Sequence, residues 1–262
     1  MQTLIARHDG PVLHLTLNRP EVRNAMSMTM ARELRTQLAH AEADGSTRVV
    51  VLRGAGGHFC AGADFQDLAA ARARLAEDWN ALKDADAAIG ELCQAFADTG
   101  LATVAVLEGT VMGGGFGLAC VVDVALAGTG AVFRLPEASQ GLVPAQIAPR
   151  LVERLGHAEA KRLAITGGSL NAEAALALRL VHEVHAAGAL DHALADMLAS
   201  ILKCAPGAVA ATKTLMARAR LEAASALVQP AAEIFAAALL GAEGTEGLLA
   251  AQGQRKPGWV PQ

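Results

Sequence analysis

The chain has 262 residues, of which 53% are hydrophobic and 18% are charged, and this is enough apolar material to bury one large core. Its 26 acidic and 22 basic residues give a net charge of -4 at pH 7, so the sequence lacks the concentrated basic surface that a nucleic-acid partner requires. We therefore expect a globular protein that binds no nucleic acid.

The N-terminal segment and the cysteines bear on the compartment. Residues 1–10 (MQTLIARHDG) carry charges and no uninterrupted apolar run, which predicts neither a signal peptide nor a membrane anchor. No stretch approaches the roughly 20 apolar residues that a spanning helix needs. The cysteines are widely spaced, form no C-x-x-C pair and predict neither a disulfide framework nor a zinc site; they are Cys60, Cys93, Cys120 and Cys204. We expect a cytoplasmic protein with no metal and no membrane partner.

The predicted elements begin with a β-hairpin. Residues 3–9 (TLIARHD) and 12–18 (VLHLTLN) flank a Gly-Pro turn, and the second run alternates apolar and polar side chains with the period of a half-buried strand. A helix is expected over residues 27–44, where apolar side chains recur at helical spacing and Ser27 is a candidate N-cap. Residues 48–54 (RVVVLRG) form a short apolar run, as in a strand that is covered on both faces.

Further buried strands and helices follow. A helical stretch over about residues 72–98 leads into residues 101–109 (LATVAVLEG), and residues 121–128 (VVDVALAG) supply a third buried strand. Buried strands that are separated by helices predict right-handed parallel crossover units and therefore an α/β fold.

From about residue 146 the pattern changes to one helix after another. The Ala-rich segments 189–204 and 208–242 carry Leu, Ile and Met at helical spacing, so we expect packing or subunit-interface helices there. We divide the chain into a core of residues 1–200 and a helical C-terminal region of residues 201–262.

Two glycine-bearing turns follow predicted buried strands: residues 54–68 (GAGGHFCAGADFQDL) and residues 109–119 (GTVMGGGFGLA). In each, the chain turns on small residues and enters a helix, whose first backbone N–H groups lack intrahelical partners. The helix dipole adds partial positive charge there, which suits a developing oxyanion. The second turn lacks the features of a phosphate loop or a dinucleotide fingerprint. Taken singly, each glycine cluster is also compatible with a tight turn or a close-packing site.

Taken together, five segments resemble, in order and spacing, the signature motifs of the crotonase (enoyl-CoA hydratase/isomerase) superfamily. They are LNRPEVRNAMS (17–27), HFCAGADFQDL (58–68), VMGGGFGLACVVDVALAG (111–128), FRLPEASQGLVP (133–144) and RLGHAEAKRLAITG (154–167). The resemblance extends from about residue 3 to the Arg-Lys-Pro near the C-terminus. GGGFGLAC, LVPAQIAP and GAEGTEG look most like the branch that acts on glutaconyl-type CoA esters, the isohexenylglutaconyl-CoA and methylglutaconyl-CoA hydratases.

The resemblance implies a fold, a substrate and an assembly. The fold is the crotonase-like spiral of ββα units, followed by a helical C-terminal region that mediates trimerisation. The substrate is an acyl-CoA, so coenzyme A enters as part of the substrate and no separate cofactor is implied. The assembly is a homotrimer or a dimer of trimers.

The resemblance also assigns the catalytic groups. The backbone N–H groups of Ala63 and Gly114 form an oxyanion hole, which polarises the thioester carbonyl; loss of one such donor typically costs about 2.7–4 kcal/mol. Glu137 matches a catalytic glutamate of the family. The apolar segment AVFRLP before it favours a partly desolvated carboxyl with a raised pKa, as general acid–base catalysis needs.

The expected substrate contacts surround these groups. They are Arg23, Ala61, Gly62, Asp64, Phe65, Gly113, Gly117, Gln146 and Lys256. By the resemblance, the segment Ala61–Gln66 lines the CoA arm, while Arg23 and Lys256 meet CoA phosphates, with solvated surface charge as the alternative for both. Asp64 is also a candidate cap of the following helix. Gln146 either places its amide near the acyl group or caps a helix.

The sequence departs from the two-glutamate hydratases at Gly117, where those enzymes carry a second glutamate that helps to activate water. Three reactions stay open. Glu137 alone could catalyse hydration while Gly117 leaves room for a branched acyl chain, one proton shuttle could isomerise a double bond, or the site could perform decarboxylation or thioester hydrolysis. A noncatalytic CoA-binding or scaffold subunit is the alternative of another class. We favour hydration of an α,β-unsaturated acyl-CoA of a branched or glutaconyl type.

Overall fold

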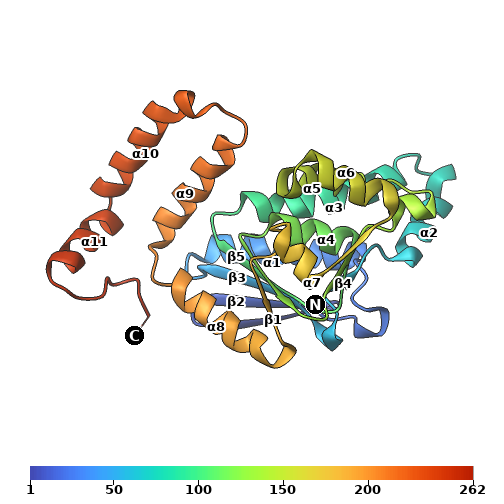
Figure 1. The fold of residues 1–262 in the computed structure, drawn as a ribbon, viewed down its shortest axis with the longest axis horizontal. Helices are drawn as coiled ribbons and strands as arrows, with labels where there is room; N and C mark the ends of the chain where they lie inside the picture. Colours follow the sequence, from blue (N-terminus) through green and yellow to red (C-terminus); the bar gives the residue numbers. More distant parts are fainter. Residues whose placement is uncertain (262) are drawn as a thin grey trace. The chain divides into compact units, whose positions relative to one another are not determined.

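The computed structural model describes residues 1–261 and has the α/β architecture that the sequence predicts (Figure 1). The chain forms two compact units. The first comprises Met1–Ala97 and Thr103–Leu194, and the second comprises Asp98–Ala102 and the residues from Ala195 onward. The sequence analysis placed this division after residue 200.

The first unit contains a six-stranded sheet with the strand order β1-β2-β3-β5-β7-β10. Its strands are β1 (Leu4–Asp9), β2 (Val12–Leu17), β3 (Val49–Gly54), β5 (Ala102–Leu107), β7 (Val124–Gly128) and β10 (Glu183–His185). β1 and β2 form the predicted antiparallel hairpin, whereas the β2–β3, β5–β7 and β7–β10 pairs are parallel. Every residue of β5 is buried, as expected for an apolar strand that is covered on both faces.

The first predicted helix forms at the expected place. It is α1 (Met28–Asp44), and the Ser27 hydroxyl accepts a hydrogen bond from Met30 N–H over 3.1 Å, so the predicted N-cap is confirmed. The buried side chains of α1 recur at the spacing that predicted the helix; they are Met30, Ala31, Leu34, Leu38 and Ala41.

The helical stretch predicted over residues 72–98 begins earlier and is interrupted. It consists of α2 (Phe65–Ala73), a short 3-10 turn (Arg74–Ala76) and α3 (Ala81–Asp98). Asp64 caps α2, because its Oδ1 accepts from Gln66 N–H over 2.8 Å. The periodicity of α2 is weak since none of its residues is buried, and this explains why the apolar pattern did not reveal its start.

A second sheet, which the sequence analysis missed, has the strand order β4-β6-β8-β9. Its strands are β4 (Cys60–Ala61), β6 (Thr110–Met112), β8 (Val132–Arg134) and β9 (Ser169–Asn171). β4 and β8 both pair with β6 in parallel, and β9 pairs with β8 in the antiparallel direction. Strands of two or three residues are too short to show an alternating pattern. The two glycine-bearing turns follow β3 and β5 of the first sheet, as predicted, and each of them also contributes a short strand, β4 or β6, to the second sheet.

Helix α4 (Gly113–Val121) starts directly after β6 and is buried from Gly113 to Cys120. It packs against β4, β6 and β8 on one side and against α5 on another. The helices that follow are α5 (Ala148–Leu155), α6 (His157–Thr166), α7 (Ala172–Ala177) and α8 (Leu190–Ile201). The change to successive helices predicted from about residue 146 is confirmed, apart from the short strands β9 and β10.

The second unit is helical, and Figure 1 shows its helices near the C-terminus. They are α9 (Pro206–Ala219), α10 (Val228–Leu240) and α11 (Ala242–Gln252), and α10 packs against both others. The Ala-rich segment 208–242, where helices were expected, consists mainly of α9 and α10 with a break between them. Pro230 lacks a backbone N–H and is tolerated in the first turn of a helix, which fits a new helix that starts at Val228.

Among residues 1–261 no single helix is long and apolar enough to cross a membrane. Two successive pairs of helical segments reach that length and composition only across a break; they are 187–201 with 206–219, and 224–240 with 242–252.

Candidate active site

Three segments leave the second sheet at the C-terminal ends of neighbouring strands. β4, β6 and β8 are neighbouring parallel strands, and their last residues lie side by side in register; these are Ala61, Met112 and Arg134. Because parallel strands share a direction, the segments that follow leave the sheet at the same ends, and strands about 4.8 Å apart keep these strand ends within roughly 10 Å of one another. The segments carry Ala63, Gly114 and Glu137 within two or three residues of the strand ends. The fold therefore places the three predicted catalytic residues at the same end of the second sheet.

The backbone N–H of Ala63 points away from the segment around Met26, which pairs with the Ala63 turn. In the parallel bridge between Met26 and Ala63, Met26 N–H donates to Gly62 O over 2.7 Å and Asp64 N–H donates to Met26 O over 3.1 Å. Successive amides of an extended segment point in opposite directions, so the Ala63 N–H faces the side where β6 ends. No acceptor among the described residues takes this N–H. It is therefore available to a ligand.

The amide of Gly114 lies in the first turn of α4. Met112 provides no side-chain cap, and the first N–H groups of a helix have no intrahelical acceptor. Gly113 has a φ of 51°, and a Cβ at this residue would lie 2.8 Å from Gly62 Cα and 3.4 Å from Ala63 N. The two turns are thus in backbone contact, and only glycine fits between them. Two adjacent unpaired amides of this kind can serve as an oxyanion hole.

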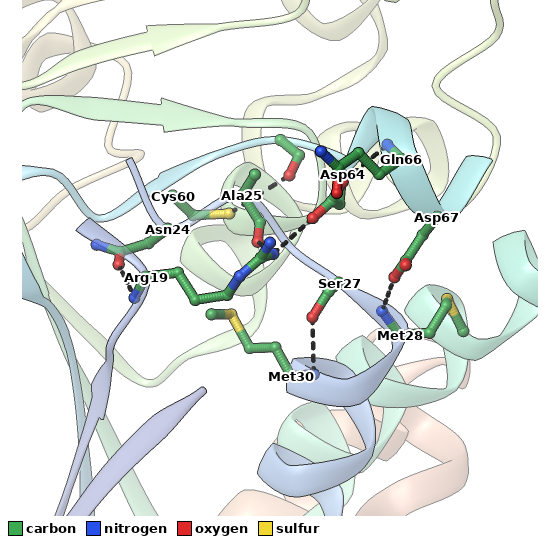
Figure 2. A network of polar contacts seen from close by, with 11 residues as sticks. Arg19, Asn24, Ala25, Ser27, Met28, Met30, Cys60, Asp64, Gln66 and Asp67 are labelled. Carbon is green, nitrogen blue, oxygen red and sulfur yellow. Dashed lines mark hydrogen bonds and ion pairs between the residues drawn. The ribbon is translucent and has the colours of Figure 1, made fainter. Parts of the chain in front are cut away.

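An ion pair fixes the loop that carries Ala63 (Figure 2). Arg19 Nη1 lies 2.6 Å from Asp64 Oδ2 and donates to Ala25 O over 2.9 Å. Burial opposes ionisation of Asp64, but the hydrogen bonds from Arg19 and from Gln66 N–H outweigh it and hold the pKa of Asp64 below its ordinary value. Asp64 caps α2, as expected. Both of its oxygens have partners within the protein, so its contact with a substrate stays a prediction.

Asn24 ties the same loop to the end of β3. Its side chain is fully buried, and its Nδ2 donates to Ala55 O over 2.9 Å and to His58 O over 2.7 Å. Its Oδ1 accepts from Arg19 N–H over 2.8 Å. Its φ is 57°, a left-handed conformation that asparagine tolerates better than most residues. The sequence analysis missed the roles of Arg19 and Asn24, because neither has its loop partner nearby in the chain.

Glu137 opens a short 3-10 turn, Glu137–Gln140, which Gly141 closes. The residue is half-buried, and its Oε2 is buried without a hydrogen-bond partner among the described residues. Burial raises the pKa of Glu137, and the hydrogen bond from its own backbone N–H offsets this only in part. The raised pKa expected from the sequence is confirmed. A carboxyl of this kind suits general acid–base catalysis.

The other expected contacts lie mostly at the surface. The Phe65 side chain is exposed, and so is that of Arg23, whose backbone carbonyl accepts from Ala61 N–H over 3.0 Å. Lys256 is exposed in the second unit. Arg23 thus contributes to the loop through its backbone, while the CoA contacts assigned to these side chains stay predictions.

Gly117 is packed rather than open. A Cβ at Gly117 would lie 2.9 Å from Cys93 Sγ and 3.6 Å from Ile147 Cγ1. Since Cys93 is fully buried on α3, the Cβ position of Gly117 offers no free room. The space for a branched acyl chain expected at Gly117 therefore does not lie at this Cβ position, and space for the acyl chain farther from the backbone stays a prediction.

Other polar groups near the turns are engaged in the fold. Ser139 Oγ donates to a carbonyl of its own turn, Asp67 accepts from the first amide of α1, and His58 Nδ1 accepts from the first amide of β6. Burial raises the pKa of Cys60 to about 11 and that of Cys93 to about 12, so both thiols are protonated at neutral pH. Among these groups, only the Glu137 carboxyl combines an unpartnered oxygen with a raised pKa.

Comparison with known proteins decides the family. The sequence model described as enoyl-CoA hydratase/isomerase matches residues 7–262. The chain belongs to the enoyl-CoA hydratase/isomerase family. The resemblance and the crotonase fold expected from the sequence are thereby confirmed, and the protein is a member of a family of enzymes.

The similarity to other members of the enoyl-CoA hydratase/isomerase family covers most or all of the chain. The 2,3-dehydroadipyl-CoA hydratase of Escherichia coli (strain K12) is 30% identical over 259 residues, 98% of each chain. The carnitinyl-CoA dehydratase of Proteus mirabilis (strain HI4320) is 33% identical over 219 residues, 82% of this chain and 80% of the relative. An enoyl-CoA hydratase/isomerase from Marinobacter aquaeolei has a TM-score of 0.95 at 44% identity and covers 100% of both chains. Pseudomonas aeruginosa AtuE has a TM-score of 0.95 at 48% identity, with 99% and 100% covered.

Replacing Arg19 by Met should destabilise the protein at neutral pH, because it leaves the Asp64 carboxylate without its cation. The two side chains are 19% and 9% exposed, so we expect a loss of roughly 2–4 kcal/mol in the free energy of unfolding, somewhat below the values for fully buried pairs. Urea unfolding measures this loss. Arg7→Met is the control: its pair with Asp9 is 61% and 69% exposed, and we expect a change within about 1 kcal/mol.

The Arg19→Met difference should depend on pH. The depressed pKa of Asp64 stabilises the wild type above the unfolded-state pKa, and this stabilisation is lost as the pH falls through the folded-state value. The gap between wild type and variant should therefore narrow in acid. A gap of constant size from neutral pH into acid would contradict the ion-pair explanation.

Gly117→Ala should lower the free energy of unfolding by roughly 1–3 kcal/mol, since the added methyl group collides with Cys93 Sγ. In a Cys93→Ala background the same substitution should cost less, with a coupling of about 0.5–3 kcal/mol in a double-mutant cycle. Gly130→Ala is the control, because nothing lies within 4 Å of its Cβ position. Additive costs at positions 117 and 93 would show that the two residues do not meet.

Proposed function

We propose that the protein is an enoyl-CoA hydratase that adds water across the α,β double bond of an acyl-CoA thioester. One observation supports the proposal: the segments that carry the unpaired amides of Ala63 and Gly114 and the half-buried Glu137 carboxyl all leave the second sheet at the C-terminal ends of neighbouring parallel strands. This set contains what hydration needs, namely donors for a thioester oxygen and a group that can accept and return a proton.

In the proposed mechanism the thioester oxygen accepts hydrogen bonds from Ala63 N–H and Gly114 N–H. These bonds strengthen as negative charge develops on that oxygen, so they stabilise the enolate-like transition state more than the substrate. Both donors belong to the backbone, and the contact between Gly62 and Gly113 keeps their turns at a fixed separation. The donors are therefore preorganised.

Glu137 transfers the proton from the water to the substrate. Its ionised carboxylate accepts a proton from the water whose oxygen bonds to the β-carbon, and it then delivers that proton to the α-carbon. The carboxyl returns to its starting state, and the water has supplied both the hydroxyl group and the hydrogen. The raised pKa of Glu137 lies closer to neutral pH than the pKa of a free glutamate, which favours both proton transfers. The reaction is redox-neutral, so it needs no redox cofactor, and the family resemblance implies no metal.

We further propose a branched or glutaconyl-type acyl group, on the strength of the sequence resemblance, and an acyl-CoA held by the segment Ala61–Gln66. A relative named 2,3-dehydroadipyl-CoA hydratase supports a substrate of related chemistry. A homotrimer or a dimer of trimers is proposed in the same way. Exposed apolar side chains on α10, among them Phe235 and Leu240, are compatible with such an assembly.

Double-bond isomerisation is the second candidate, because Gly117 leaves one carboxyl where the two-glutamate hydratases have two. Incubation of the purified protein with crotonyl-CoA, 3-methylglutaconyl-CoA and other enoyl-CoA esters in ¹⁸O-labelled water separates the reactions. We expect labelled oxygen in the acyl chain. A shifted double bond without label would indicate isomerisation, release of CO₂ would indicate decarboxylation, and free CoA would indicate thioester hydrolysis. If no ester binds, a noncatalytic role replaces the proposal.

Glu137→Gln should lower kcat by roughly 10²- to 10⁴-fold, because the amide cannot accept and return the proton. It should not destabilise the protein at neutral pH. The raised pKa means that the stability of the wild type falls as the pH rises through the folded-state pKa, whereas glutamine stays neutral. Any stability gap between the two should close in acid. Glu173→Gln, at an exposed position, is the control and should keep full activity. Full activity of Glu137→Gln would eliminate the one-glutamate mechanism.

A further inference from the structure

The Gln146 carboxamide occupies space against α3 that is free only because residue 90 is a glycine. A Cβ at Gly90 would lie 2.1 Å from Gln146 Oε1 and 2.8 Å from its Cδ. Gly90 is within α3, where glycine weakens the helix relative to alanine. Any other residue at position 90 would displace the Gln146 carboxamide. The sequence at position 90 therefore favours the placement of this group over the stability of the helix.

Asp86 sets the orientation of the carboxamide. Gln146 Nε2 donates to Asp86 Oδ2 over 2.7 Å, and Asp86 lies one turn before Gly90 on the same face of α3. This bond is exposed, so its contribution to stability is small and of the same order as the cost of Gly90. With Nε2 engaged, Oε1 is the acceptor, and it has no partner among the described residues.

The residues next to Gly90 and Gln146 contact the first turns of α4. Ile89, the neighbour of Gly90, lies against Gly114, since a Cβ at Gly114 would be 3.2 Å from Ile89 Cγ2. Ile147, the neighbour of Gln146, lies against Gly117 in the same way. Gly90 and Gln146, which meet at the carboxamide, are therefore each next in sequence to a residue that packs against α4. This is the helix that carries the proposed oxyanion donor Gly114.

The charged side chains near Gln146 do not compete with its carboxamide for a ligand. Arg150 on α5, four residues after Gln146, pairs with Glu153 on the same helix and donates to Gln94 on α3. Asp86 is the anion next to Gln146. An anionic group of a ligand would be repelled there, whereas a hydroxyl group or a water molecule that donates a hydrogen bond fits the free Oε1.

We propose that Gln146 Oε1 accepts a hydrogen bond from the water that adds to the β-carbon, and from the β-hydroxyl group of the product in the reverse direction. Asp86 is a positioning residue that acts through Gln146. The inference rests on the proposed hydratase function and assigns to Gln146 the water-holding task for which Gly117 provides no side chain. No bond forms to Gln146, and the proton of the water passes to Glu137.

The test measures kcat and KM for hydration of crotonyl-CoA and 3-methylglutaconyl-CoA by the full-length protein, with ¹⁸O incorporation as a check on the reaction. Gln146→Met keeps the length of the side chain and removes its hydrogen bonds. We expect kcat to fall by roughly 3- to 10-fold, the effect of one neutral hydrogen bond, while KM changes by less than about 2-fold. Asp86→Ala should lower kcat as well. Asp86→Asn should restore it, because the asparagine oxygen still accepts from Nε2.

Gly90→Ala provides a variant that removes no polar group. In the wild-type background it should lower kcat as Gln146→Met does, because the added methyl group displaces the carboxamide. In a Gln146→Ala background it should leave kcat unchanged and should not lower the melting temperature, since alanine favours the helix. A purely structural role for Gln146 would instead give the same effect of Gly90→Ala in both backgrounds.

The outcomes separate this inference from the function on which it rests. If the wild type incorporates no label from any ester, the hydratase proposal fails and the role of Gln146 fails with it. If the wild type hydrates an ester while Gln146→Met and Gly90→Ala keep kcat within about 2-fold, only the role of Gln146 is overturned. If Asp86→Asn is as slow as Asp86→Ala, Asp86 does not act through the bond to Nε2.

Discussion

The register of β4, β6 and β8 is the constraint on which the proposed site depends. These strands have only two or three residues each, yet their last residues lie side by side, and each strand delivers one of the groups proposed to act on the substrate. A shift of one residue in any of the pairings would reverse the direction of the amides and side chains that follow. The polar network of Arg19, Asn24 and Asp64 holds the β4 turn, which no long strand stabilises.

Helix α4 shows how the fold combines dense packing with unpaired donors. Its first turn leaves amides free, while its glycines allow β4, α3 and the segment before α5 to approach the helix backbone. Gly115 illustrates the closeness, because a Cβ there would lie 2.4 Å from Cys60 Cβ. The glycine at position 117 belongs to the same packing.

Much of the fold follows from local patterns in the sequence. The hairpin, α1 with its Ser27 cap and the buried strands β3, β5 and β7 all have periodicity or apolar runs long enough to read. The second sheet does not, because its strands are too short. Resemblance to a family directed attention to Ala63, Gly114 and Glu137, but the physical reason for their proximity lies in a sheet that the sequence did not reveal. Arg19 and Asn24 belong to the LNRPEVRNAMS segment, but their contacts with Asp64, Ala55 and His58, like the contact of Asp86 with Gln146, join residues distant in the chain, and no local pattern predicts such contacts.

The backbone contact between Gly62 and Gly113 has a consequence for how such a site can diversify. The separation of the two donor turns is determined by main-chain atoms that touch each other, so it does not depend on the volume of any side chain nearby. In the proposed site, substitutions around the turns would therefore alter which acyl group fits, or which residue holds water, while the position proposed for the thioester oxygen stays the same. On this proposal, the thioester oxygen is bound by main-chain atoms and the reaction is chosen by side chains, and only the side chains are open to ordinary amino-acid exchange.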